Sequence, residues 1–286
     1  MLETIRELVR PPPGMAFDFS QPAGEPALAP SDGVAWRVFA NPLSLFIGGV
    51  TAVLLELAEP SVRSGVWDHS NFKRDPGTRL RRTGFAAMMT VYGPRSEAEK
   101  LIARVVRMHG RVEGHTPDGL PYHANDPRLL DWVQATAAFG FTEAYHAYVQ
   151  PLSAREKDAA FAEGELAAGL YGATGAPRSW SEWEALLART APGLEGSGIL
   201  ADFVRIMRDA PILPAPLRGL QRLLVRAAVQ IVPEPVRSLP QLRGGGLRPG
   251  EALLVRGLAR AAALLPLDEM PPAQAARRLA GSRNPG

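Results

Sequence analysis

Histidine is the residue type in this chain with the widest choice of chemistry, because its ring nitrogens can hold a metal or move a proton near neutral pH. The chain has five histidines, at positions 69, 109, 115, 123 and 146. His109 lies in a segment of helical periodicity, roughly 95–113, where the residues at helical offsets from it are apolar: Ile102, Val105, Val106 and Val112. The imidazole is therefore predicted on an apolar helix face. Spacing alone leaves two interpretations, a core histidine bonded to a neighbouring helix or a metal ligand.

A second group of chemically capable side chains lies upstream. Arg79, Arg82 and Thr83 are spaced i, i+3, i+4 and share one face of a predicted helix, 77–91, with Ala86 and Ala87. Two guanidinium groups and a hydroxyl above small side chains form a polar spot that a flat ligand can approach closely. The same pattern is also typical of a solvated basic stripe.

A non-haem metal site is a further alternative. His109, His115 and His123 could bind a metal together with Asp118 or Asp126, since the glycines and the proline between them predict an irregular loop. Their spacing matches no standard metal site.

Composition narrows the remaining chemistry. The chain has 286 residues, is 46% hydrophobic and contains no cysteine, which excludes disulfides, thiolate-ligated haem and cysteine-ligated iron–sulfur clusters. Its formal charge is only +3, and its arginines alternate with acidic residues, so no basic face for nucleic acid is expected. The sequence lacks G-x-G-x-x-G, P-loop, H-E-x-x-H and G-x-S-x-G motifs.

The periodicity predicts an all-α protein with one multi-helix domain. Helices are expected at 33–39, 43–58, 60–67, 77–91, 95–113, 127–149, 153–170, 179–190, 197–208, 215–231, 249–264 and 271–280. Asp126 before Pro127 predicts a capped helix start, and Ser153 and Ser179 begin capping-box patterns with Glu156 and Glu182. Residues 1–31 are predicted to form a short helix and an arm rich in proline and glycine, and residues 32–286 the helical domain.

No membrane span or secretion signal is expected. Met1–Arg10 is an amphipathic helix start followed by three prolines rather than an apolar run. The apolar stretch 42–55 has about 14 residues, whereas a spanning helix needs roughly 20. We therefore expect a cytoplasmic protein without a transmembrane segment.

Four ordered sequence blocks resemble one known family. They are Asp68-His69-Ser70-x-Phe72, then Asp75-Pro76-x-x-Arg79-x-x-Arg82-Thr83, then His109-x-x-Val112-x-Gly114, then Asp126-Pro127-x-Leu129-Leu130-x-Trp132-Val133. In this order they are similar to the MpaB and latex-clearing-protein family, whose characterised members are the rubber oxygenases. The blocks span about residues 40–150, with weaker matches near 216–240.

The resemblance implies an all-α haem b protein, with a globin-like helical core around the haem pocket. It implies His109 as the proximal iron ligand and Arg79, Arg82 and Thr83 on the distal side of the haem, where they would bind the cofactor and act in catalysis. The implied reaction is oxygenation of a hydrophobic small molecule, such as an alkene or an isoprenoid, using dioxygen and an electron donor of unspecified kind.

The chain departs from the family pattern at three positions. Latex-clearing proteins have a lysine where this chain has Arg82, and a guanidinium stays protonated and cannot bind iron. Many members have histidine where this chain has Glu59 and Gln134. These changes keep two alternatives open: a haem protein without oxygenase activity, such as a sensor or carrier, and a helical interaction protein that has lost haem, with His109 as a core residue.

Overall fold

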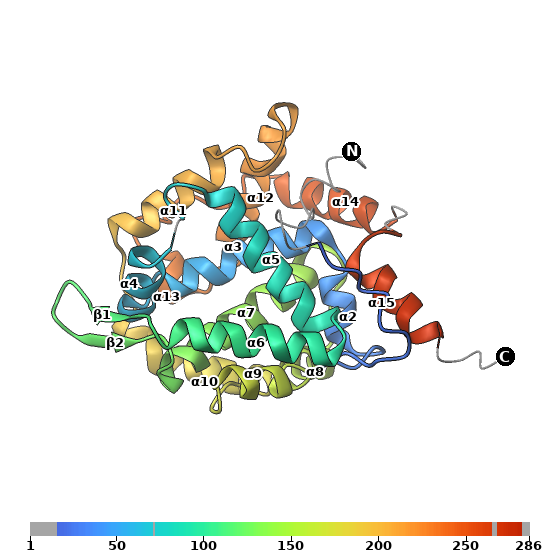
Figure 1. The fold of residues 1–286 in the computed structure, drawn as a ribbon. Coiled ribbons are helices and arrows are strands. Elements are labelled where there is room, and N and C mark those ends of the chain that lie inside the picture. Colours follow the sequence, from blue (N-terminus) through green and yellow to red (C-terminus); the bar gives the residue numbers. More distant parts are fainter. Residues whose placement is uncertain (1–15, 71, 265–267, 282–286) are drawn as a thin grey trace.

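The computed structural model describes residues 16–70, 72–264 and 268–281. In these ranges the chain is helical apart from turns, loops and one small hairpin, which confirms the predicted all-α class (Figure 1). The α-helices are α2 Val34–Phe39, α3 Pro42–Glu56, α4 Pro60–Asp68, α5 Pro76–Tyr92, α6 Arg95–His109, α7 Pro127–Tyr148, α8 Ala154–Ala162, α9 Glu165–Tyr171, α10 Trp180–Thr190, α11 Gly198–Asp209, α12 Arg218–Ile231, α13 Glu234–Arg237, α14 Glu251–Ala263 and α15 Pro271–Ala280. Short 3₁₀ turns occupy Ala191–Gly193 and Ala215–Leu217. The helix predicted at Met1–Arg10 lies outside the described residues.

Proline and capping side chains fix where several helices begin. α3, α4, α5 and α7 each have proline at the first helical position, and the preceding Asn41, Glu59, Asp75 and Asp126 accept hydrogen bonds from first-turn N–H groups. Ser153 forms the predicted capping box with Glu156. Ser179 also caps its helix, but the Glu182 carboxylate accepts from the Arg178 N–H, so the reciprocal bond of a capping box is absent there.

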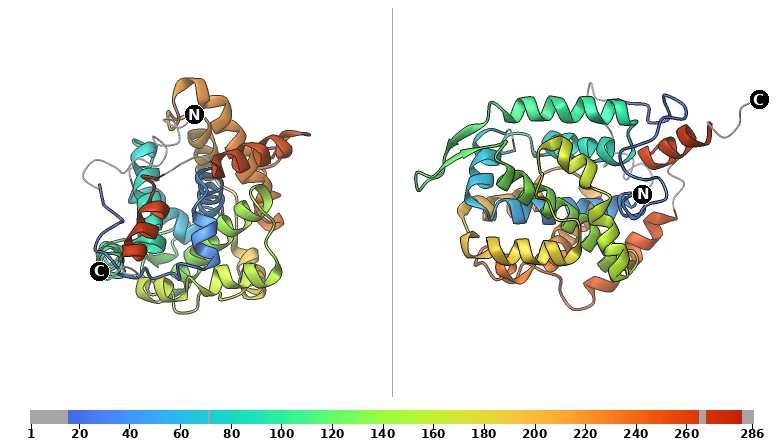
Figure 2. Two further views of the ribbon diagram at one scale, coloured as in Figure 1. Left: turned by 90° about the vertical axis from the view of Figure 1, so that its right-hand side faces the viewer. Right: turned by 90° about the horizontal axis from the view of Figure 1, so that it is seen from below.

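The core is built around α3, which is apolar on nearly all sides and packs most extensively on α7 (Figure 2). Two glycines allow this close crossing. A Cβ atom on Gly48 would lie 2.8 Å from the Gly140 carbonyl oxygen, and one on Gly140 would lie 2.5 Å from the Gly48 carbonyl oxygen. α12 and α14 pack on the same pair of helices. α3 is therefore a central buried helix, as predicted from its composition.

Two predicted helices are shorter than expected. The helix predicted at 95–113 ends at His109, where Gly110 is the C-cap, and the chain then forms a hairpin of β1 Glu113–His115 and β2 Pro121–His123. The strands are antiparallel, with Gly114 opposite Tyr122, and the hairpin projects from the helical body (Figure 2). The helix predicted at 153–170 breaks at Glu163 and Gly164 into α8 and α9.

In the described residues, no single helix is long and apolar enough to cross a membrane. α3 and α4 reach the required length and hydropathy only when they are taken together, and they are bent by 113° relative to each other.

Candidate functional site

His109 is the last residue of α6, and α5 and α6 diverge from the corner that joins them at Gly93 and Pro94 (Figure 1). Its neighbours on the helix face are apolar as predicted: Ile102 is buried, and Val105 and Val106 are half-buried. Val112 lies beyond the end of the helix but still packs against the core. Burial, and next the positive charge of Arg79, lower the pKa of His109. The imidazole is therefore held neutral, which is the state that binds a metal.

The hydrogen bonding of His109 differs from that of the other histidines. His69 Nε2 lies 3.2 Å from the Tyr122 hydroxyl, and the Nδ1 atoms of His123 and His146 accept backbone N–H groups. His115 is exposed on β1. His109 Nδ1, in contrast, is buried and has no hydrogen-bond partner among the described residues. A bond from His109 to a neighbouring helix is therefore not made through Nδ1, and both interpretations of this histidine stay predictions.

Arg79 and Glu56 lie close enough for each charge to shift the pKa of the other. Arg79 is exposed by surface area, yet burial is the main cause that lowers its pKa; the Glu56 charge raises this pKa and the Arg82 charge lowers it. Glu56, at the end of α3, is only half-buried by surface area, and burial is again the main cause of its shifted pKa. From these two properties together we infer an unfilled space beside the two side chains. We call this space the Glu56–Arg79 hollow, and His109 lies within range of the Arg79 charge.

Burial raises the pKa of Glu56 to about 7, against the Arg79 charge and the Thr136 hydroxyl, which both lower it. Thr136, on α7, is fully buried and donates its hydroxyl to the Val133 carbonyl oxygen. A protonated Glu56 can donate to Thr136, so the carboxyl, the hydroxyl and the carbonyl form a short chain of polar groups. Near neutral pH, Glu56 can both give and take a proton.

Sequence reasoning missed Glu56 and Thr136. In the sequence, Glu56 only marks the end of the apolar stretch 42–55. The one signal in the sequence is that this helix is apolar on nearly all sides, which predicts a buried helix but does not tell whether its terminal carboxylate faces water or the interior.

Arg82 and Thr83 share the predicted α5 face with Arg79 and are exposed. The Thr83 hydroxyl donates to the Arg79 carbonyl oxygen at 3.0 Å. The Arg82 charge lowers the pKa of both Arg79 and Asp75, which places its guanidinium near the mouth of the helix pair rather than beside Glu56. The structure thus brings Arg79 together with His109 and Glu56, and leaves Arg82 and Thr83 at the edge of this group.

The two other departures from the family pattern lie away from the Glu56–Arg79 hollow. Glu59 caps α4 by accepting the Val62 N–H at 2.7 Å and forms an ion pair with Arg128. Gln134 points away from Thr136 on α7 and lines a different hollow of about 670 Å³ beside Phe161 and Gly164. Both side chains have structural surroundings of their own.

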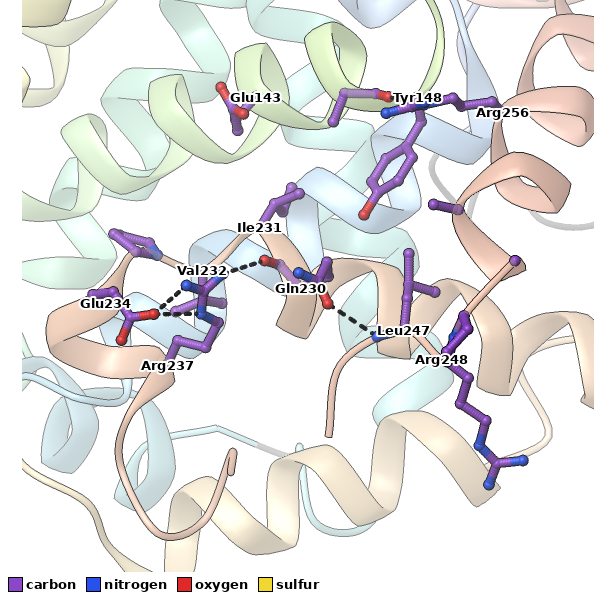
Figure 3. Close-up of a pocket in the computed structure, with 15 residues that line it drawn as sticks. Glu143, Tyr148, Gln230, Ile231, Val232, Glu234, Arg237, Leu247, Arg248 and Arg256 are labelled. Atoms are coloured by element: carbon purple, nitrogen blue, oxygen red, sulfur yellow. Dashed lines mark hydrogen bonds and ion pairs between the residues drawn. The ribbon is translucent and has the colours of Figure 1, made fainter. Parts of the chain in front are cut away.

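Another hollow, of about 660 Å³, lies between α7, α12 and the start of α14 (Figure 3). Arg237 pairs with Glu234 on its rim and donates to the Gln230 carbonyl oxygen, and the Gln230 side chain accepts the Leu247 N–H. None of the predicted site residues lines this hollow or the one beside Gln134.

The residues around His109 fit a haem group. A neutral imidazole with an unpartnered buried nitrogen, an apolar helix face beside it and arginines for carboxylate groups are what a haem site requires. If Nε2 bound the iron, one expected feature would be missing, because Nδ1 has no hydrogen-bond partner in the described residues. The same residues contain no group of three His, Asp or Glu side chains that could hold a metal ion without haem.

Comparison with known proteins agrees with the four sequence blocks. The model of the family described as ER-bound oxygenase mpaB/B'/Rubber oxygenase, catalytic domain, matches residues 36–264. Two proteins described as uncharacterized, Mb2261 of Mycobacterium bovis and Rv2237 of Mycobacterium tuberculosis, are each 26% identical over 174 residues, which cover 59% of this chain and 68% of each relative. No solved structure matches the chain significantly. Because the family match spans most of the chain, this protein belongs to the MpaB/rubber oxygenase catalytic-domain family.

Proposed function

We propose that this protein is a haem b-dependent oxygenase that acts on a hydrophobic small molecule of the alkene or isoprenoid kind, with His109 as the iron ligand. The observation that carries the proposal is the neutral imidazole of His109, whose buried Nδ1 has no protein partner among the described residues and which lies in range of the Arg79 charge. Membership of an oxygenase family supports the reaction class.

When bound, haem would supply the site at which dioxygen binds and is activated, with any electrons needed for its reduction coming from a separate donor. The positive charge of Arg79 acts on both the imidazole and Glu56, which favours anionic groups in the Glu56–Arg79 hollow. Arg82 supplies guanidinium donors at the edge of the hollow, and Thr83 can serve as a donor only if its hydroxyl leaves the Arg79 carbonyl oxygen. Glu56, with a pKa of about 7, exchanges protons with the hollow through its carboxyl group.

The alternative of a haem protein without oxygenase activity depends on Glu59 and Gln134. Because Glu59 caps α4 and Gln134 lines a different hollow, neither change alters the groups around Glu56 and Arg79. The oxygenase interpretation is therefore favoured.

Visible absorption spectra of the purified protein, oxidised and then reduced with dithionite, test the cofactor. We expect a Soret band that His109→Ala abolishes and that the exposed control His115→Ala leaves intact. Purified protein without a Soret band after expression with haem supplied, or unchanged haem content in His109→Ala, would contradict the proposal.

The reaction is tested by adding dioxygen and candidate alkenes to the reduced protein. We expect oxygenated product, which mass spectrometry detects. A stable oxygen complex without product from any alkene would support a sensor or carrier instead.

A further inference from the structure

A row of aromatic rings connects the interior of α7 with the surface of α10. The rings of Trp132 and Trp183 are stacked, with centroids 5.8 Å apart, and Phe139 stacks on Trp183 at 4.8 Å. Phe139 also lies 5.6 Å from Trp180. These two separations keep the indoles of Trp183 and Trp180 within about 10 Å of each other. Three of the five tryptophans of the chain thus lie in one continuous row.

The inner end of this row lies one helical turn from the residue that hydrogen-bonds Glu56. Trp132 is 2% exposed and precedes Thr136 by one helical turn on α7, and Thr136 hydrogen-bonds Glu56. The outer end is Trp180, the first residue of α10, which is half-buried. The row therefore leads from the proposed cofactor pocket to the outside of the protein.

Proton acceptors distinguish the two ends of the row. An indole that has lost one electron is a strong acid at its N–H group, and it becomes a neutral radical where a base takes the proton. The Trp132 Nε1 group is buried without a hydrogen-bond partner in the described residues, so no base lies ready there. The Trp180 Nε1 group donates to Glu184 Oε1 at 3.0 Å, and this carboxylate can take the proton.

The charges around Trp180 also favour the loss of an electron at the outer end. The Lys157 ammonium lies 3.9 Å from the centre of the ring and opposes it. However, Lys157 is paired with Glu143 at 2.9 Å, Asp158 accepts the backbone N–H of Trp180, and Glu184 accepts the indole N–H. Three carboxylates and one ammonium leave this end negative, which stabilises a positive charge on the indole.

We infer that Trp132, Trp183 and Trp180 form a path for electron transfer between the cofactor pocket and the protein surface. Through this path, an oxidising equivalent that remains in the pocket is passed to the outside of the protein. This inference rests on the proposed function. Trp132 donates one electron to the oxidised cofactor. Trp183 then reduces the oxidised Trp132, and Trp180 reduces the oxidised Trp183. Glu184 accepts the indole proton of Trp180. A one-electron reductant outside the protein, of the ascorbate or thiol class, reduces the Trp180 radical, and the proton returns from Glu184 to the indole nitrogen. One electron thus crosses the protein for each oxidising equivalent removed.

The experiment mixes the haem-loaded protein with hydrogen peroxide, freezes it rapidly and records the electron paramagnetic resonance of protein radicals. Ring-deuterated tryptophan identifies the tryptophan signal, and mass spectrometry locates the oxidised residues. We expect a tryptophan radical in the unaltered protein, with oxidation concentrated on Trp180. Trp132→Phe should abolish the tryptophan signal, and Trp180→Phe should move oxidation to Trp183 and Trp132.

Matched variants separate the path from general damage. Trp36 contacts Tyr92 edge to face in a different core cluster from the row, so Trp36→Phe should leave signal and oxidation pattern unchanged. Glu184→Gln keeps an acceptor oxygen but is a much weaker base, so the radical on Trp180 should decay faster. If Trp132→Phe does not fold, Trp183→Phe interrupts the same row. An undiminished tryptophan signal in a folded row variant with an intact Soret band overturns the inference alone, whereas the absence of a Soret band overturns the proposed function.

Discussion

At the residue scale, burial decides the charge of each candidate group. It lowers the pKa of His109 and raises that of Glu56 to about 7, so the imidazole is neutral and the carboxyl is partly protonated at neutral pH. The Arg79 charge acts on both groups, although burial lowers the pKa of Arg79 too. The Glu56–Arg79 hollow therefore contains one fixed positive charge and one exchangeable proton, an arrangement suited to reactions that consume protons.

Replacement of Glu56 tests this assignment through the stability of the protein. A carboxyl whose pKa rises on folding, here from 4.5 to about 7, holds its proton more tightly in the folded state. The free energy of unfolding then falls as pH rises through that interval and levels off above it. Glu56→Gln removes this loss, so we expect it to stabilise the protein by about 1–3 kcal/mol at pH 8 and to change little near pH 4.5.

Urea unfolding at several pH values measures this effect. Glu113→Gln, on the exposed strand β1, is the control, and its curve should run parallel to that of the unaltered protein. If Glu56→Gln has the same effect at pH 4.5 and pH 8, the carboxyl does not titrate in the predicted interval.

The sequence indicated some of these residues but not their grouping. The apolar face of His109 follows from helical periodicity, and Arg79 shares its face with Arg82 and Thr83 by spacing. The proximity of these residues to Glu56 cannot be predicted from the sequence, because Glu56 and Arg79 lie on different helices. No local sequence pattern indicates which helix ends lie close together in the fold. A lone carboxylate after an apolar run also has the same appearance in sequence whether it faces water or an internal hollow.

At the element scale, the contact between α3 and α7 positions the site. Glu56 ends α3, Thr136 lies in the middle of α7, and Gly48 and Gly140 set how closely the two helices approach. Helix positions were largely predictable because prolines and capping side chains mark their starts. The end of α6 was not, since Val112 continues the apolar period past the Gly110 C-cap, and three-residue strands are too short to show an alternating pattern.

Gly140→Ala tests the importance of this close crossing. Its Cβ would lie 2.5 Å from the Gly48 carbonyl oxygen, so the helices must separate. We expect a loss of about 1–3 kcal/mol in the free energy of unfolding, as for other overpacked cores. Because Glu56 and Thr136 lie on these two helices, the haem content should fall as well.

Gly257→Ala on α14 is the matched control for this substitution, since a Cβ atom there would have no other atom of the described chain within 4 Å beyond its own helix. It should stabilise the helix by about 0.5–1 kcal/mol. Chemical denaturation measures both variants, and a Gly140→Ala protein as stable as the unaltered chain would show that the helices can accommodate the methyl group.

At the scale of the whole molecule, the two ends of the described chain are tied to the corner between α5 and α6. Arg278 of α15 is 1% exposed and donates to three backbone carbonyl oxygens: that of Phe19 at 2.6 Å, of Glu25 at 2.8 Å and of Tyr92 at 2.7 Å. Phe19 in turn packs against Phe85 on α5. One side chain thus joins the N-terminal arm, the last helix and the helix that carries Arg79.

Arg278→Met tests whether this junction supports the site. The variant keeps an apolar chain of similar length but leaves three carbonyl groups without their donors, so we expect a loss of about 2–4 kcal/mol in the free energy of unfolding. Limited proteolysis should then cut the arm at residues 16–30 well before the helices are cut. The neighbouring Arg277→Ala loses an exposed bond to the Asp268 carbonyl oxygen and a solvent-screened attraction to Asp18, so it should change both measurements far less than Arg278→Met does. Equal protease resistance of the arm in Arg278→Met and the unaltered protein would show that Phe19 and the other packing contacts hold it in place without the arginine.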